Sequence, residues 1–207
     1  MGIPIFFVLF IIFILVFNFK MRKNGKSNRE KLENYYQREE RAMSVRKQPL
    51  DDLKLYRLDL NKLPFEIIQT KVFMDIEKDI VRLSKLPMAS FKGQDNTELK
   101  LKYGVANLNT LIQYETTYNL MLQRLVEWSS LLKDEGYSRE AMEVLEVGIH
   151  LDSDMSQNYL LLLSIYEETN EMDKLKEFGH LIHERNILRK DLVLQKYNVI
   201  KKEKGLR

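Results

Sequence analysis

The 207-residue sequence contains no cysteine, and only 4 prolines and 8 glycines. The missing thiols exclude disulfide bonds, thiolate nucleophiles and cysteine-built zinc sites. So few turn-forming residues argue against an all-β protein, which needs a tight turn between most of its strands. Hydrophobic residues make up 44% of the chain and charged residues of both signs 30%, which is typical of a globular and mainly helical protein. The composition therefore predicts an all-α fold.

The local motifs of the common enzyme classes are also missing. The sequence has no glycine-rich phosphate-binding loop, no dinucleotide-binding fingerprint and no nucleophile elbow. His180 and His183 lie three residues apart, but they lack an HExxH context, and two histidines alone do not complete a zinc site. We therefore expect no enzymatic activity, no catalytic or metal-binding residues and no cofactor.

The positive charge is concentrated in one short segment. Residues 20–50 hold ten Lys or Arg and four Glu, a net charge of +6, whereas residues 51–207 carry a net charge of −3. A nucleic-acid-binding protein normally carries its basic surface on the folded domain. We therefore expect no nucleic-acid partner.

The N-terminal segment is a long hydrophobic run. Every residue from Ile3 to Phe17 is apolar, and Lys20 is the first charged side chain. A cleaved signal peptide is disfavoured because no basic residue precedes the run and no small-residue cleavage site follows it. A core helix this uniformly apolar would need burial on every side. We predict that residues 1–19 form a transmembrane helix and contact the lipid bilayer through residues 3–19.

The basic residues beside this run predict an orientation. Lys20, Arg22, Lys23 and Lys26 follow the apolar residues directly, so the positive-inside rule places the N-terminus outside the cell membrane and the C-terminal domain in the cytoplasm. The four side chains either contact anionic lipid headgroups or act only as the topology signal. The rest of the 20–50 linker is predicted to contain a charged spacer helix. Alternatively, this helix binds the membrane surface or pairs with a second copy as a short coiled coil. Apart from that coiled coil, nothing in the sequence supports a homo-oligomer.

Helical periodicity dominates after an extended segment at residues 53–60. Apolar residues recur at three- and four-residue steps from Pro64 to Leu86, and Asp95 with Glu98 has the spacing of a capping box for a second helix over 96–117. We interpret residues 51–118 as a helical capping region.

The next stretch contains a repeat of 34 residues. The paired positions are Leu125 with Tyr159, Trp128 with Leu162, Leu132 with Tyr166, Gly136 with Asn170, Ala141 with Leu175 and Gly148 with Ile182. This helix–turn–helix period is that of tetratricopeptide repeats, and the segment EAMEVLEVGIHLD resembles the second helix of that family. The resemblance covers residues 122–187, although Leu175 and Ile182 replace the small residues usual in the family. It implies two repeats over 119–187 in an α-solenoid, with residues 188–207 as a capping helix and tail.

A domain of this kind generally binds its partner in a concave groove lined by the first helix of each repeat. The resemblance places in that groove Gln123, Val126, Ser130, Lys133, Asp134, Gln157, Leu160, Ser164, Glu167 and Glu168. Repeats that bind acidic peptide tails have Asn and Lys or Arg at such positions. Serines and acids stand here instead, which favours a basic or apolar helical segment as the partner.

The sequence thus predicts a single-pass membrane-tethered scaffold or adaptor that binds an unidentified protein. The first alternative is an obligate structural subunit of a membrane complex, and the second is an enzyme whose site lies in the unassigned residues 50–118. A soluble, monomeric fragment of residues 48–207 would favour the adaptor, whereas an aggregating fragment would favour the subunit.

Overall fold

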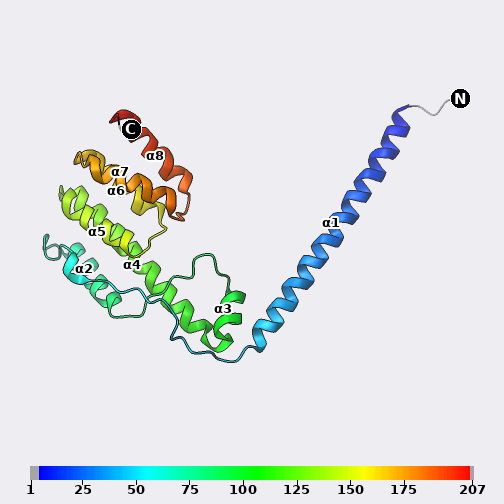
Figure 1. Ribbon diagram of the computed structural model, residues 1–207, viewed down its shortest axis with the longest axis horizontal. Coiled ribbons are helices and arrows are strands. Elements are labelled where there is room, and N and C mark those ends of the chain that lie inside the picture. Colours follow the sequence, from blue (N-terminus) through cyan, green and yellow to red (C-terminus); the bar gives the residue numbers. More distant parts are fainter. Residues whose placement is uncertain (1–4, 206–207) are drawn as a thin grey trace. The chain divides into compact units, whose positions relative to one another are not determined.

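The computed structural model describes residues 5–205, except for the side chains of residues 5, 8, 18, 19 and 21–28. Its elements are α1 (Ile5–Ser44), η1 (Leu60–Lys62), α2 (Lys71–Ser84), α3 (Asn96–Tyr103), η2 (Val105–Asn107), α4 (Leu108–Asp134), α5 (Ser138–His150), α6 (Ser156–Glu168), α7 (Met172–Glu184) and α8 (Lys190–Glu203) (Figure 1). The only β pairing in the described part is an isolated bridge between Tyr56 and Met88. The predicted all-α fold is confirmed.

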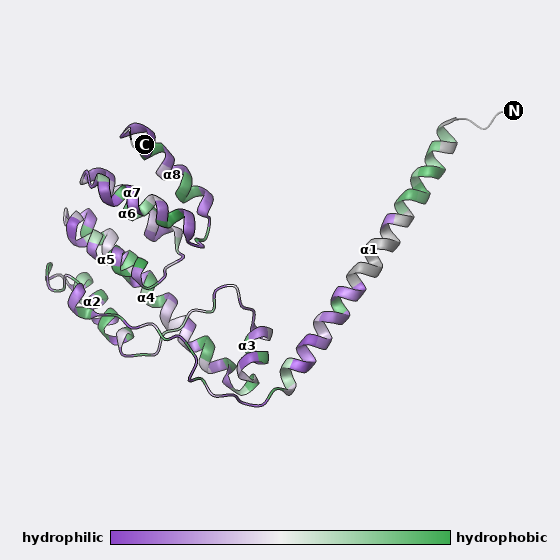
Figure 2. Cartoon of the chain, in the orientation of Figure 1, coloured by the Kyte–Doolittle hydropathy of each residue, from purple (hydrophilic) through white to green (hydrophobic). Residues whose placement is uncertain are grey.

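The predicted transmembrane helix is wrong. Among the residues that the structure describes, no helix is sufficiently long and apolar to cross a membrane. The apolar stretch from Ile5 to Phe17 covers only about 20 Å of α1, because an α-helix rises about 1.5 Å per residue, whereas a hydrocarbon core is about 30 Å thick. Figure 2 shows hydrophobic residues in the N-terminal turns of α1 and mainly hydrophilic ones toward Ser44. The predicted orientation of the chain assumed a membrane span, and it stays a prediction.

Two helix boundaries also differ from the sequence-based prediction. The helix predicted from Pro64 begins only at Lys71, because Glu66 adopts a positive φ of 65° and interrupts the helical backbone. The helix predicted over 96–117 is divided at Gly104, whose φ of 84° ends α3. The capping box at the start of α3 is confirmed, since the Glu98 amide donates to Asp95 Oδ1 at 2.7 Å.

The chain forms two compact units, and the first combines the segment up to Asp51 with Lys92–Asn109. Here the C-terminal end of α1 packs on α3. The Glu39 carboxylate accepts hydrogen bonds from Thr97 Oγ1 at 2.7 Å and from the Lys100 ammonium group. Ala42, one turn further along α1, is fully buried. This unit is therefore held together by a buried small residue and a polar cluster.

The second unit combines Asp52–Phe91 with the chain from Thr110 onward. Helices α5 to α8 follow one another in a stack (Figure 1). The largest fully buried side chains of its core include Trp128, Tyr118 and Tyr159. The Phe65 ring stacks on Trp128 with centroids 5.3 Å apart. The predicted extended segment is found at residues 53–59, where the Tyr56 amide donates to Met88 O at 2.8 Å, but Leu60 already belongs to η1.

The two helical hairpins of this unit have matching turns 34 residues apart. Gly136 and Asn170 both have a positive φ, of 88° and 58°. In each turn the following amide reaches back to the last helical turn, with Tyr137 N to Leu132 O at 2.8 Å and Glu171 N to Tyr166 O at 2.9 Å. Such bonds close the C-terminal end of a helix and reverse the chain. The predicted helix–turn–helix period is thus present in the backbone, whereas the family resemblance stays a prediction.

The loop between α5 and α6 is held by Asp152, a residue with a φ of 62°. Its carboxylate accepts hydrogen bonds from Lys54 Nζ at 2.8 Å, from Tyr56 Oη at 2.9 Å and from the Arg185 guanidinium group. Burial on its own would raise the pKa of this carboxyl, but the three donors outweigh burial and lower the pKa to about 2. One ionised side chain thereby connects three separate segments of the second unit.

Candidate functional site

A cavity of about 440 Å³ lies between α4 and α6. Four of the predicted groove residues line it, namely Gln123, Val126, Ser130 and Gln157. Val126 is almost fully buried, whereas Gln123 and Gln157 are exposed. Its other lining residues are Val72, Glu127, Leu131 and Met155. The cavity therefore has apolar side chains together with amide, hydroxyl and carboxylate groups.

An ion pair joins the C-terminal ends of the same two helices. Lys133 Nζ lies 2.7 Å from Glu168 Oε1, and both residues were predicted to line the groove. The lysine side chain is 24% exposed and the glutamate 50%. Because each charge is already balanced by the other, this pair contributes little net charge to the recognition of a ligand.

A second cavity, of about 370 Å³, lies between α6 and α8. From α6 it is lined by the predicted groove residue Glu167, and from α8 by Leu192, Gln195, Lys196, Val199, Ile200 and Glu203. The predicted groove residue Ser164 accepts a hydrogen bond from the Lys196 ammonium group. The Glu167 carboxylate forms no hydrogen bond or ion pair with a described side chain, so it is available to a ligand.

Five of the ten predicted groove residues do not line either cavity, namely Lys133, Asp134, Leu160, Ser164 and Glu168. Leu160 is half-buried and packs against the hydrophobic core. Asp134 is exposed at the last position of α4. Of the predicted membrane-surface residues, Lys20 is exposed on α1, whereas the side chains of Arg22, Lys23 and Lys26 lie outside the described ones.

The sequence patterns do not predict that Val72 and residues of α8 line these cavities. Those patterns indicate only a capping helix and tail for residues 188–207, and only a hydrophobic helix face for Val72. Leu192 and Val199 are seven residues apart, which places both on one face of α8. That spacing predicts an apolar face on α8, but it does not predict whether this face packs in the core or lines a cavity.

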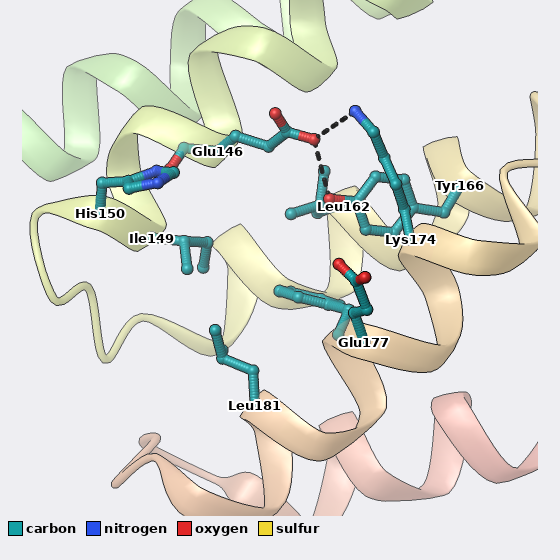
Figure 3. A pocket seen from close by; sticks show the side chains of 9 residues that line it. Glu146, Ile149, His150, Leu162, Tyr166, Lys174, Glu177 and Leu181 are labelled. Atoms are coloured by element: carbon teal, nitrogen blue, oxygen red, sulfur yellow. Dashed lines mark hydrogen bonds and ion pairs between the residues drawn. The ribbon is translucent and has the colours of Figure 1, made fainter.

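A third cavity, of about 310 Å³, is formed by α5, α6 and α7 (Figure 3). Its lining residues are Glu146, Ile149, His150, Leu162, Tyr166, Lys174, Glu177, Phe178 and Leu181. Glu146 Oε1 accepts hydrogen bonds from Tyr166 Oη at 3.0 Å and from Lys174 Nζ at 2.8 Å. Burial raises the pKa of the Tyr166 hydroxyl, and the neighbouring Glu146 charge raises it further, so the hydroxyl stays a proton donor.

Within the described part of the chain, no group of three or more His, Asp and Glu side chains is placed to hold a metal ion. His180 and His183, three residues apart on α7, are both exposed, and neither lines the cavities described above.

Comparison of the chain with protein-family models, with curated proteins and with solved structures finds no match.

Proposed function

We propose that this protein is a scaffold or adaptor that binds a protein partner along α4, α6 and α8. The proposal rests on one observation. One cavity is lined by four predicted groove residues from two helices, namely Gln123, Val126, Ser130 and Gln157. A second cavity lies between α6 and α8 and adds Glu167. We call the two cavities together the α4–α6–α8 groove. A groove with apolar patches and a polar rim is the usual receptor for an amphipathic helix.

The charges of the α4–α6–α8 groove favour a partner helix that carries basic residues beside apolar ones. Glu168 is already paired with Lys133, so Glu167 and Glu203 supply the carboxylates left for a partner's Lys or Arg. Val199 of α8 is 51% exposed, and Val72 of α2 is 56% exposed. Both offer apolar area to the same segment.

Quantitative capture of the partner tests this function. Full-length protein with Glu167→Lys or Gln157→Arg should lose at least about 90% of the captured partner, since about 1.4 kcal/mol corresponds to a tenfold change in affinity. Glu184→Lys is the matched control, because it makes the same charge change at an exposed site at the C-terminal end of α7, where a cation is favourable. Undiminished capture by both groove variants would refute the assignment.

We also propose that the N-terminal part of α1 contacts a lipid surface. The described large side chains from Phe6 to Phe17 are all exposed, from 40% for Ile14 to 79% for Phe6. They surround the helix, so it has no polar face to turn toward water. The basic residues that follow, beginning with Lys20, would attract anionic headgroups at about 1 kcal/mol each.

Vesicle flotation tests the lipid contact. Full-length protein should float with vesicles that contain about 30% phosphatidylglycerol, and less with phosphatidylcholine alone, because the basic segment adds an electrostatic contribution. Phe10→Asp together with Ile14→Asp should abolish flotation, whereas Leu32→Asp, at an exposed site further along α1, should not. Equal flotation of all three proteins would exclude residues 6–17 as the contact.

A further inference from the structure

The α5–α6–α7 cavity of Figure 3 has an apolar floor and an acidic rim. The floor consists of Ile149, Leu162, Phe178 and Leu181. Glu146, Glu177 and Lys174 contribute two negative charges and one positive charge, so the rim has a net charge of −1. Ligand sites of this composition bury an apolar body and orient it through a few polar groups. The volume of about 310 Å³ is at the lower end of the usual range, which suits one or two side chains of a peptide.

The free polar atoms of this cavity are mainly hydrogen-bond acceptors. Both bonds to the Glu146 carboxylate go to Oε1, which leaves Oε2 without a protein partner in the described structure. The Glu177 carboxylate has no hydrogen bond or ion pair with a described residue either. His150 Nδ1 donates to the Glu146 carbonyl oxygen at 2.7 Å. A ligand group with several N–H donors and a positive charge would satisfy these atoms.

The cavity continues into an extended surface. Glu146 and His150 also line a neighbouring cavity of about 240 Å³, which α5 shares with residues 57–62. A ligand seated over Phe178 would therefore pass Glu146 and His150 to reach the second cavity. This continuity fits a chain of several residues better than a compact small molecule.

We propose that the α5–α6–α7 cavity binds a peptide segment in which an Arg or Lys stands next to a bulky apolar residue. The apolar side chain occupies the floor against Phe178 and Leu181, where it is removed from water. The guanidinium or ammonium group lies between Glu146 and Glu177, with Glu146 held in place by Tyr166 and Lys174. This site is separate from the α4–α6–α8 groove and does not depend on it.

Fluorescence anisotropy with full-length protein tests the site. The probe is a fluorescein-labelled octapeptide with Leu-Arg-Phe at its centre, and we expect saturable binding below about 1 mM. Glu177→Lys should weaken binding at least about tenfold, since it places a cation at the predicted cation site without disturbing a buried group. Leu181→Ala should weaken binding through the apolar floor. Norleucine in place of the peptide arginine should weaken binding of the probe to a similar extent.

Two control variants distinguish binding in this cavity from a general charge effect and from binding in the α4–α6–α8 groove. Glu184→Lys changes the net charge equally on the same helix and should leave the affinity within about twofold of the original. Glu167→Lys alters only the α4–α6–α8 groove and should also leave it unchanged. The inference is overturned if the peptide does not saturate, if Glu177→Lys binds as tightly as the original protein, or if either control weakens binding as much as Glu177→Lys.

Discussion

Gly148 of α5 lies against the carboxamide of Asn158 of α6, so closely that a Cβ atom on residue 148 would overlap Asn158 Oδ1. Asn158 is fully buried, and its Nδ2 donates to Leu145 O at 3.1 Å. The close approach of the two helices therefore requires glycine at position 148. The same approach fixes α6, which contributes Gln157 and Glu167 to the proposed groove.

Gly148→Ala should lower the free energy of unfolding by about 1–3 kcal/mol, because the added methyl group overpacks a closed interface. Urea denaturation measures this effect. Asn158→Ala should be less harmful in the Gly148→Ala background than alone, since the shortened side chain makes room for the methyl group. Glu143→Ala, at an exposed site of the same helix, serves as the control and should be nearly neutral. A Gly148→Ala protein as stable as the original would contradict the packing described.

The low pKa of Asp152 predicts a dependence of stability on pH. Its pKa of about 2 in the folded protein lies below the ordinary value of 3.8, so the ionised form stabilises the fold above about pH 5. That contribution is lost as the pH falls from about 5 to about 2. Asp152→Asn should lower the free energy of unfolding by about 1 kcal/mol at pH 7, a value reduced by solvent screening at this partly exposed site.

The same comparison at low pH provides the check. The stability difference between the original protein and Asp152→Asn should shrink as the pH approaches about 2. Asparagine is a suitable substitute because it tolerates the positive φ of residue 152. Asp51→Asn, an exposed site, should show no such difference. A constant difference between about pH 7 and about pH 3 would mean that the charge of Asp152 does not stabilise the loop.

The contact between α1 and α3 depends on Glu39. The Lys100 side chain is only 10% exposed, so Glu39→Gln would leave a largely buried ammonium group without its counter-charge. We expect faster hydrogen exchange of the α3 amides, by about tenfold or more, since an unsatisfied buried charge costs at least about 1–3 kcal/mol. Glu40→Gln, at the exposed neighbouring position, should leave exchange unchanged. Equal exchange in both variants would exclude this contact.

The single tryptophan offers a direct probe of the second unit. Trp128 is fully buried and stacked on Phe65, so its emission should be that of an apolar environment and should shift to longer wavelength on unfolding. Phe65→Leu should lower the free energy of unfolding by about 1 kcal/mol through loss of the ring contact. Native emission typical of a water-exposed indole would contradict the position of Trp128 in the core.

Much of the helical fold could be predicted from short-range patterns. The capping box at Asp95 and the turn at Gly136 depend on residues a few positions apart, and both are evident in the sequence. The contact of Glu39 with Lys100 could not be predicted, because it joins polar residues 61 positions apart and no periodic pattern accompanies it. This contact also affects how the solubility test of the 48–207 fragment is interpreted. A fragment starting at residue 48 would remove the α1 segment that covers α3, so aggregation of that fragment would not indicate an obligate subunit.

The residues of the α4–α6–α8 groove could be predicted where their positions follow from the helical repeat. The 34-residue period places Gln123 and Gln157 at equivalent positions of successive hairpins, and both line one cavity. It did not predict that Lys133 and Glu168 neutralise each other, because that pairing depends on the orientation of two side chains. The α5–α6–α7 cavity could not be predicted for a similar reason. In the sequence, Tyr166 and Phe178 look like ordinary core residues of two helices. Only the packing of α5, α6 and α7 shows that a cavity lies beside them.

Site-specific photocrosslinking in cells tests the central claim most directly. A benzophenone amino acid at Gln123 or Gln157, both exposed in the α4–α6–α8 groove, should crosslink to the same partner protein. The same probe at Lys176, exposed on α7 and absent from the lining of the described cavities, should not. Crosslinks from Gln123 and Gln157 that disappear with Glu167→Lys are the result we predict. Crosslinks from Lys176 alone, or from none of the three positions, would contradict the proposed function.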